Sequence, residues 1–499
     1  MMKNKYQFCA MISTLIFGLI AHGYMLTNKL CYHDDAASFF SFGGDYTSGR
    51  WSMGLWRDLW LRLGIMQYST PFWNGLVFIF FIAIASGILV KMFQLENYLI
   101  VAIMGATLIC FPTVASIFAY MFTAPAYGFA ILLAVFCVYS ADKGKCGVIA
   151  SAIMLMISMG IYQAYFGVAT ALFVLRLILN QEEIKKKWVV ACRDLGILVV
   201  GLLGYFVGNK VCLKLKGLGM SDYQGLNQMG EMSIQNIIDS IGLSYEQFFV
   251  PLDGDYYGIT NVLWIQILFK ILMGMAFILL IISVWKKQGV LDKLFQVLLI
   301  ILIPLSVNIV FVMTGSEGTL VHTLMVVPYV FVLLYPVLLC EKLQVSEVVK
   351  KANIVLLLLM LVFFVKLDNT AYLKATHNQE VAISYYTNLI GRIKSVEGYH
   401  PFMPVLFYGV QVKEDVSIAH LEEFDSITLK GYNTTEDEFI AYHANEAFLR
   451  IHCGYTYDVP ANRNDYLMTE EFASMPVYPE DGAIRCIDNV IVVRLAVWE

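Results

Sequence analysis

The sequence predicts a polytopic α-helical membrane protein with about eleven transmembrane helices and a C-terminal α/β domain outside the membrane. Three observations lead to this fold class. Of the 499 residues, 59% are hydrophobic and only 15% are charged, whereas soluble chains carry about 25% charged residues. Apolar runs near or above the roughly 18 residues that cross a bilayer recur along most of the chain. After residue 366 these runs stop, and a more polar segment of ordinary domain size follows.

Eleven apolar segments are the expected membrane spans. The first follows Lys3 and Lys5, as a secretory signal would, but it lacks a small-x-small cleavage site before Thr27. We therefore interpret it as an uncleaved first helix. The expected spans are 8–25, 71–92, 97–117, 125–140, 147–161, 165–179, 188–208, 261–285, 295–313, 322–339 and 352–365.

Lysine residues indicate which side of the membrane each loop faces. The short loops around Thr113, Tyr162 and Gly315 contain no Lys or Arg, whereas lysines gather at the opposite ends of the spans. The positive-inside rule therefore predicts a cytoplasmic N-terminus, and an odd number of spans places the C-terminal domain outside. The lysines on the cytoplasmic side are Lys3, Lys5, Lys91, Lys143, Lys145, Lys185, Lys186, Lys187, Lys286, Lys287, Lys293, Lys342, Lys350 and Lys351.

We expect two domains, a transmembrane domain over 1–366 and a soluble extracytoplasmic α/β domain over 367–499. Two long outer loops, 27–70 and 209–260, belong to the first domain. Helical periodicity that begins near Ser233 in the second loop is typical of a short helix in the membrane interface.

The C-terminal segment contains signals of both helices and strands. Its periodicity predicts a helix over 379–396 and another that ends near Arg450. A short apolar strand over 404–410 and a hairpin that turns at Asp488-Asn489 predict a sheet. The segment is therefore expected to fold as a mixed α and β domain.

The first outer loop contains residue types that suit sugar transfer from a lipid phosphate. It places Asp34-Asp35 shortly after the first helix, and Arg50 and Trp51 about 15 residues later. A carboxylate can take the proton from an attacking hydroxyl, and an arginine can hold a departing phosphate. An aromatic ring can stack on a sugar face or lie at the level of the lipid headgroups. The alternative is a solvated acidic loop in which Asp34 only caps the following helix.

Further candidates lie near the outer ends of other spans, and each has a structural alternative. Gln163 could bind a sugar hydroxyl or join two helices. His322 could bind phosphate or cap a helix, and Lys210 could attract a headgroup or anchor its helix end. Candidates for binding the donor phosphate are Arg50, Arg57, Lys210 and His322, and those for the sugar or acceptor are Trp51, Tyr162, Gln163 and Glu317.

Two questions of ligation stay open at the level of sequence. Asp34, Asp35 and Asp45 could share Mg²⁺ or Mn²⁺ through oxygen ligands, but their spacing is not diagnostic of a metal site. Cys453 and Cys486 could form a disulfide in an extracytoplasmic domain, although spacing alone does not show that they meet.

Four motifs in order resemble one family over nearly the whole chain. They are Asp34-Asp35, then Gly49-Arg50-Trp51, then the hairpin Gly160-Ile161-Tyr162-Gln163, and last Tyr478-Pro479-Glu480-Asp481-Gly482 before a β-hairpin. The sequence resembles the polytopic bacterial glucosyltransferases of the serotype-converting type II kind, which belong to the GT-C superfamily. One departure is that the family often has an acidic residue before the tyrosine of the fourth span, where residues 122–127 read Phe-Thr-Ala-Pro-Ala-Tyr.

The resemblance implies an inverting transfer of glucose from undecaprenyl-phosphate glucose to a cell-surface glycan. It implies that Asp34 or Asp35 is the base and that Arg50 holds the phosphate. The expected location is the bacterial cytoplasmic membrane, with the lipid bilayer, a polyprenyl-phosphate sugar donor and a surface polysaccharide as partners.

Two other classes of function are less well supported. A transporter or flippase of lipid-linked sugars would show inverted repeats and polar residues at the bilayer midplane, but no repeat between the halves is evident. A nucleic-acid-binding protein would need a basic patch, which the sequence lacks.

Overall fold

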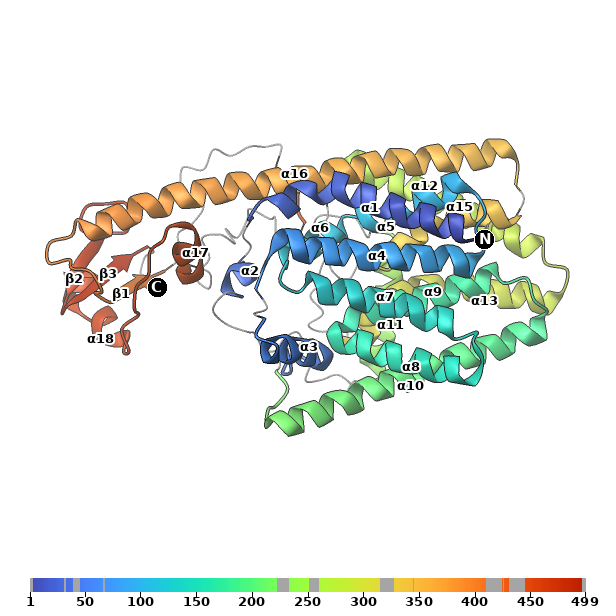
Figure 1. The fold of residues 1–499 in the computed structure, drawn as a ribbon, viewed down its shortest axis with the longest axis horizontal. Coiled ribbons are helices and arrows are strands. Elements are labelled where there is room, and N and C mark those ends of the chain that lie inside the picture. The colour runs from blue at the N-terminus through green and yellow to red at the C-terminus, as the bar shows by residue number, and fades with distance from the viewer. Residues whose placement is uncertain are drawn as a thin grey trace. The chain divides into compact units, whose positions relative to one another are not determined.

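The computed structural model describes residues 3–30, 33–38, 45–65, 68–221, 233–250, 260–314, 327–343, 345–409, 424, 426–429 and 445–495, which are mostly helical (Figure 1). The chain packs as two compact units. The first, here called the membrane unit, comprises residues 1–28, 43–370 and 426–430. The second, here called the C-terminal unit, comprises residues 29–42, 371–425 and 431–499.

The membrane unit is built from long apolar helices with short connections, as the hydropathy pattern predicts. Every expected span overlaps one of these helices. Their bounds are α1 (Lys3–Thr27), α3 (Trp51–Arg62), α4 (Pro71–Phe93), α5 (Tyr98–Cys110), α6 (Thr113–Ala119), α7 (Ala124–Ser140), α8 (Gly144–Ile161), the 3-10 turn η1 (Gln163–Tyr165), α9 (Phe166–Leu179), α10 (Ile184–Lys216), α11 (Ile234–Gln247), α12 (Leu263–Trp285), α13 (Val290–Val307), α14 (Ile309–Thr314), α15 (Tyr329–Leu343) and the first part of α16 (Glu347–Lys394).

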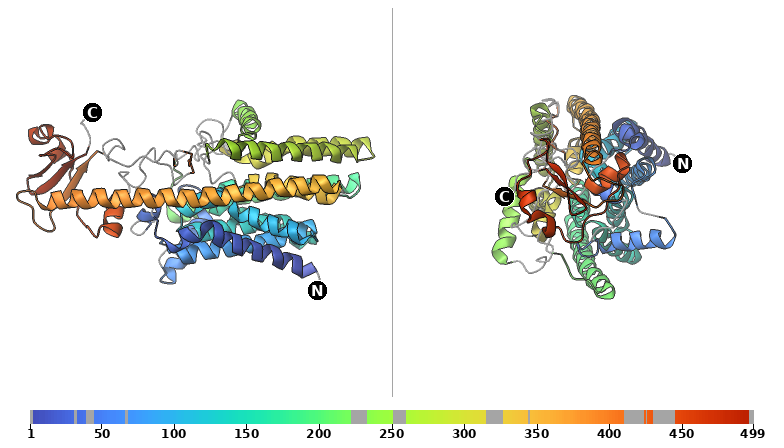
Figure 2. Two further views of the ribbon diagram at one scale, coloured as in Figure 1. Left: turned by 90° about the horizontal axis from the view of Figure 1, so that it is seen from above. Right: turned by 90° about the vertical axis from the view of Figure 1, so that its left-hand side faces the viewer.

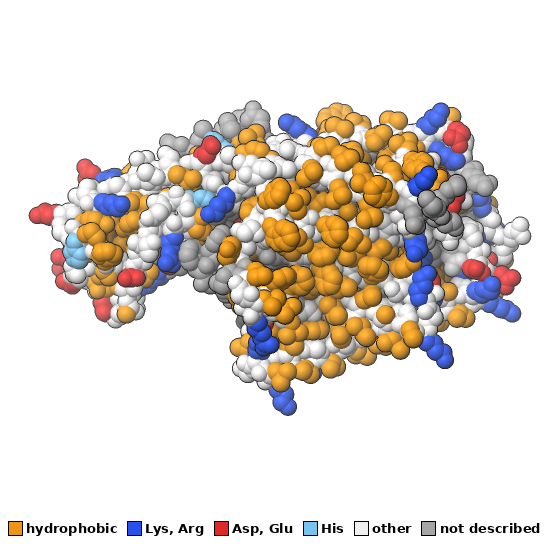
Figure 3. Space-filling model, viewed as in Figure 1, with side chains coloured by type: hydrophobic (Ala, Val, Ile, Leu, Met, Phe, Trp, Pro, Cys, Tyr) orange, Lys and Arg blue, Asp and Glu red, His pale blue; other side chains and the backbone are white. Residues whose placement is uncertain are grey.

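Eight of the helices in the described ranges are long and apolar enough to cross a membrane. They are α1, α4, α5 together with α6, α8, α10, α12, α13 and α16, while α7 and the segment from η1 through α9 are shorter apolar helices. Exposed hydrophobic side chains cover the membrane unit in Figure 3, as a surface in contact with lipid requires. The chain is therefore a multi-pass membrane protein.

Small residues let the first helices approach closely, which is typical of helix packing in membranes. A Cβ atom on Gly105 of α5 would lie 2.4 Å from the backbone oxygen of Ala10 in α1. The Thr14 hydroxyl of α1 bonds to the Ser86 hydroxyl of α4 at 3.0 Å, and also to the carbonyl of Gly105. Buried hydroxyls and a glycine thus hold α1, α4 and α5 together.

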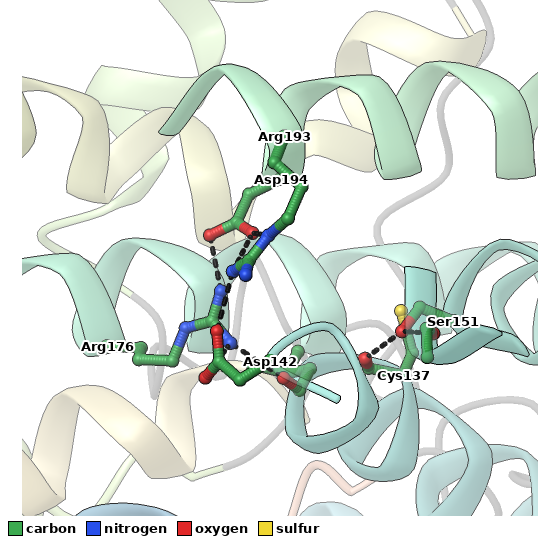
Figure 4. Close-up of polar contacts among 8 residues, drawn as sticks. Cys137, Asp142, Ser151, Arg176, Arg193 and Asp194 are labelled. Atoms are coloured by element: carbon green, nitrogen blue, oxygen red, sulfur yellow. Dashed lines mark hydrogen bonds and ion pairs between the residues drawn. The ribbon is translucent and has the colours of Figure 1, made fainter. Parts of the chain in front are cut away.

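A cluster of four charged side chains joins α7, α8, α9 and α10 (Figure 4). The Arg176 guanidinium lies 2.5 Å from the Asp194 carboxylate and 3.0 Å from that of Asp142. Arg193 reaches both carboxylates at 2.8 Å. Two positive and two negative charges balance one another, with Asp194 buried and Asp142 exposed, and such an arrangement fixes geometry more than it adds stability. We assign this cluster a structural role.

A polar network surrounds the break between α13 and α14. The Asn308 amide at the break donates to the backbone carbonyl of Ser244 in α11 and to the Tyr329 hydroxyl, both at 2.8 Å. Ser233 caps α11 by accepting from the backbone N–H of Asn236. The helix expected near Ser233 is therefore confirmed, and its buried polar face is anchored to an interrupted helix.

The C-terminal unit contains a small sheet and several helices. The helix expected over 379–396 is confirmed as the last part of α16, which is one unbroken helix of 48 residues (Figure 2). The other elements are α2 (His33–Ala37), β1 (Val405–Tyr408), α17 (Asn445–His452), α18 (Asn464–Leu467), α19 (Glu470–Ala473), β2 (Ile484–Ile487) and β3 (Val490–Arg494).

The sheet has the strand order β1-β3-β2. β2 and β3 form the expected antiparallel hairpin, in which Asp488 and Asn489 have φ values of 47° and 66°. Asp and Asn tolerate this left-handed conformation, which tight hairpin turns require. β1 pairs with β3 in parallel, and Leu406, Val492 and Phe472 pack in the core beneath the sheet. Cys453 and Cys486 are both free thiols.

Candidate functional site

The residues before α3 form a tight turn that fixes Arg50 at the N-terminus of this helix. The backbone N–H of Arg50 donates to the Asp45 carbonyl at 2.8 Å, and that of Gly49 donates to the Tyr46 carbonyl at 3.2 Å. Gly49 has a φ of 75°, and a Cβ atom there would lie 2.7 Å from both the Gln163 amide nitrogen and the Tyr205 hydroxyl. Only glycine fits at this position without displacing a neighbour.

Trp51 lies in a slot that two glycines form. A Cβ atom on Gly160 of α8 would lie 2.7 Å from the indole, and one on Gly208 of α10 would lie 2.8 Å from it. Trp51 is 7% exposed, and its indole nitrogen has no hydrogen-bond partner. The tryptophan is therefore a packing anchor between α8 and α10, and its ring is not open to a sugar in this arrangement.

Gln163 joins the Arg50 turn to α10. Its amide nitrogen donates to the Ser48 carbonyl at 2.8 Å and to the Tyr205 hydroxyl at 3.1 Å. The sequence left open whether Gln163 binds a sugar or joins helices. In the structure, the NH₂ group of its amide joins the Arg50 turn to α10.

The Arg50 guanidinium lies over one ring of a cluster of tyrosines. Its central carbon lies 5.0 Å from the centre of the Tyr162 ring. Tyr162 in turn packs against Tyr127 and Tyr165, with ring centres 5.2 and 5.3 Å away. Stacking on an aromatic face orients a guanidinium and leaves its edge N–H groups able to donate. Tyr127 is the tyrosine before which the family often has an acidic residue, and here its ring belongs to the tyrosine cluster beside Arg50.

Asp45 and Asp58 are bound to cations beside this turn. Asp45 lies 2.6 Å from Arg57, and Asp58 lies 2.5 Å from Lys216. Burial raises the pKa of the Asp45 carboxyl, against the opposing charges of Arg57 and Arg50. Burial would also raise the pKa of Asp58, but hydrogen bonds from Lys216 and Tyr46 prevail and lower it. The guanidinium of Arg57 is thus paired with the carboxylates of Asp45 and Asp58.

The described residues contain no group of three or more His, Cys, Asp or Glu side chains arranged to hold a metal ion. Asp45 faces Arg57 and belongs to the membrane unit, whereas Asp34 and Asp35 belong to the C-terminal unit. Of the three candidate metal ligands, Asp45 is thus paired with the guanidinium of Arg57 in this structure.

Asp34 and Asp35 lie on α2, in the C-terminal unit. Asp34 is exposed, whereas Asp35 is only 4% exposed. The Ser38 hydroxyl donates to the Asp35 carbonyl at 2.6 Å and closes the end of this short helix. Within the same unit, α2 packs against α17. The two acids thus have different surroundings although they are adjacent in the chain.

Of the remaining candidates, the structure describes only Lys210. Lys210 is exposed on α10, and Glu317 and His322 lie outside the described residues. Tyr205, which the sequence analysis did not single out, joins the Arg50 turn through Gln163. Glycines at 201, 204 and 208 recur at helical spacing and are a sequence signal for this face of α10. In the structure they pack against Leu155, Met156 and Trp51.

Comparison with known families supports the sequence motifs. The family described as glucosyl transferase GtrII matches residues 23–340, which is more than half of the chain. Comparisons with curated proteins and with solved structures found no match. The matched region contains Asp34, Asp35, the Arg50 turn and the Tyr162-Gln163 hairpin, so the resemblance predicted from the motifs is confirmed. The chain belongs to the glucosyl transferase GtrII family, whose activity is the transfer of glucosyl groups at a membrane.

Proposed function

We propose that this glucosyltransferase moves glucose from a polyprenyl-phosphate donor, of the undecaprenyl-phosphate type, to a cell-surface glycan on the outer face of the bacterial cytoplasmic membrane. The observation that carries the proposal is Arg50, held by Tyr162 and Gly49 at the N-terminus of α3. A guanidinium and the N–H groups of a helix N-terminus both favour a phosphate.

The position of α3 supports a donor that is anchored in lipid. Leu55, Leu59 and Leu63 are exposed on α3 and in the residue that follows it, while Arg57 and Asp58 form ion pairs on its other side. Such a helix suits the boundary between lipid and water. A donor phosphate at the headgroup level would therefore meet Arg50.

The transfer itself needs a base and a stabilised leaving group. In the proposed step, an acceptor hydroxyl oxygen attacks the anomeric carbon as the bond from that carbon to the phosphate oxygen breaks. The hydroxyl proton passes to Asp34 or Asp35, and polyprenyl phosphate leaves with both bonding electrons. Arg50 stabilises the charge that develops on the phosphate. The sugar configuration inverts, because one displacement occurs.

The proposed topology has eleven spans, a cytoplasmic N-terminus and an outer C-terminal domain. The distribution of lysines supports this orientation. The ion pair of Lys187 with Asp292, at 2.6 Å, lies at helix ends on the proposed cytoplasmic side, and the Arg50 turn lies on the opposite side. An outer site agrees with a surface polysaccharide as acceptor.

Membrane vesicles can test this function against lipid-sugar transport. Vesicles with the wild-type chain should move label from polyprenyl-phosphate [¹⁴C]glucose to envelope polysaccharide of the native host and release polyprenyl phosphate. Arg50→Ala should lower this transfer, whereas Lys145→Ala, an exposed change at the proposed cytoplasmic end of α8, should not. A transporter would instead move intact labelled donor across the membrane without labelling glycan, and that result would exclude a transferase.

A further inference from the structure

His452 has an unexplained nitrogen at the end of α17. Its Nε2 atom is enclosed by protein and makes no hydrogen bond. The imidazole lies 4.6 Å from the Phe448 ring, which contacts the buried Tyr386 ring of α16 at 5.7 Å. This aromatic stack fixes the imidazole, and an enclosed polar atom without a partner is costly unless a ligand completes it.

The helix that carries His452 lies against the start of the first outer loop. α17 packs against α2, the helix that carries Asp34 and Asp35. Burial, together with the charge of Lys29 shortly before α2, lowers the pKa of His452 to about 4. The imidazole is therefore neutral at pH 7, and it can donate to or accept from an uncharged hydroxyl.

We propose that the C-terminal unit binds the acceptor, and that the Nε2 atom of His452 on α17 binds a hydroxyl of the acceptor sugar. This inference rests on the proposed transferase activity. It gives the C-terminal unit a function in the reaction, since the base and the acceptor contact then lie on helices that pack together.

The neutral state of the imidazole favours the acceptor over the donor as its ligand. A neutral imidazole attracts a phosphate poorly. A sugar hydroxyl is uncharged and can donate to or accept from the imidazole. His452 as a whole is partly exposed, although its Nε2 atom is enclosed, so a hydroxyl reaches Nε2 only after the side chain shifts.

Steady-state kinetics of the full-length protein in vesicles would test the proposal. The donor is polyprenyl-phosphate [¹⁴C]glucose, and the acceptor is envelope polysaccharide purified from the native host. The variants are His452→Phe, which keeps the ring but not the nitrogen, and His452→Gln, which keeps a hydrogen-bonding group. The matched control is His400→Phe, because His400 lies in the same unit and already bonds to Asn489.

We expect His452→Phe to raise the acceptor KM about tenfold, as one lost hydrogen bond predicts, with the donor KM within about twofold of wild type. His452→Gln should restore much of the affinity, and His400→Phe should match wild type. An unchanged acceptor KM in His452→Phe would overturn the inference, as would equal losses in both His452 variants, which indicate a structural role. If the wild-type chain labels no glycan, the proposed function itself fails.

Discussion

Arg50 is the residue on which the proposed site depends most. Its guanidinium lies 5.0 Å from the Tyr162 ring, and its backbone is fixed by the turn from Asp45. Arg50→Ala should lower glucosyl transfer roughly 10- to 100-fold, because a charge-assisted contact contributes about 1.5–3 kcal/mol. Arg50→Lys should also be slow, since an ammonium cannot form the planar pair of bonds.

Initial rates with labelled donor in vesicles would measure these losses, with protein amounts checked by immunoblot. Lys145→Ala, an exposed change on α8, is the control for general loss of positive charge. Wild-type rates in Arg50→Ala would show that the phosphate is bound elsewhere.

Two glycines of α10 provide a matched pair for the packing of Trp51. A Cβ atom on Gly208 would meet the indole at 2.8 Å, whereas one on Gly196 would meet nothing within 4 Å. Gly208→Ala should destabilise the protein by about 1–3 kcal/mol, because the indole must shift. Gly196→Ala should stabilise it by up to about 1 kcal/mol through helix propensity.

Thermal unfolding in detergent would compare the two alanine variants under one set of conditions. Equal melting temperatures for Gly208→Ala and Gly196→Ala would contradict the close packing of Trp51 against α10.

At this scale the sequence predicted residue types better than residue roles. Arg50 is predicted from its guanidinium in the first outer loop, and Tyr162 and Gln163 from their place in a short outer hairpin. The structure brings the three residues around one turn. The roles of Trp51 and Tyr205 depend on contacts between α3, α8 and α10, which are far apart in the chain. Periodicity along one segment carries no information about such contacts.

The hairpin between α8 and α9 is the element that holds the Arg50 turn in place. Gln163 reaches from η1 to Ser48 and to Tyr205 of α10. Gln163→Leu should cost about 2–3 kcal/mol, because two hydrogen bonds are lost and their partners stay buried.

Gln163→Leu should therefore lower both the melting temperature and the transfer rate, and Gln163→Asn should do so as well, because its shorter amide cannot span the same distance. The two quantities are measured on the same detergent preparation. A normal melting temperature together with slow transfer would instead assign Gln163 a direct contact with sugar.

The elements themselves were mostly predictable. Apolar length and lysine positions indicated the helices, and Asp488-Asn489 indicated the β2–β3 hairpin. The parallel pairing of β1 with β3 was not predictable, because it joins strands about 80 residues apart. The sequence predicts two helices, over 352–365 and 379–396, where the structure has the single helix α16. The apolar pattern of this helix changes to an amphipathic one where it continues into the C-terminal unit, so the pattern gives no sign that the helix is continuous.

The proposed reaction requires that the C-terminal unit lies outside the cell and that the lysine-rich loops of the membrane unit lie in the cytoplasm. Ser474 is exposed in the C-terminal unit, so Ser474→Cys should react with a membrane-impermeant maleimide in intact cells once background thiols are blocked. Lys145→Cys, on the proposed cytoplasmic side, should react only after permeabilisation. The reverse pattern would contradict an outer active site.

The division of the chain places the acids with the C-terminal unit and Arg50 with the membrane unit. Within the C-terminal unit, α17 packs against α2, which carries the two acids. Removal of residues 371–499 should therefore abolish transfer, because α2 loses this support, even if the membrane helices still insert.

The most direct measurement is single-turnover transfer by purified protein with polyprenyl-phosphate [¹⁴C]glucose and envelope polysaccharide of the native host. The wild-type chain should label the polysaccharide and release one polyprenyl phosphate per glucose transferred. Asp34→Asn combined with Asp35→Asn should reduce the rate by at least about a hundredfold, because the base is lost, whereas the exposed Asp481→Asn should leave it unchanged. Full transfer by the double variant would contradict the assignment of these acids to catalysis.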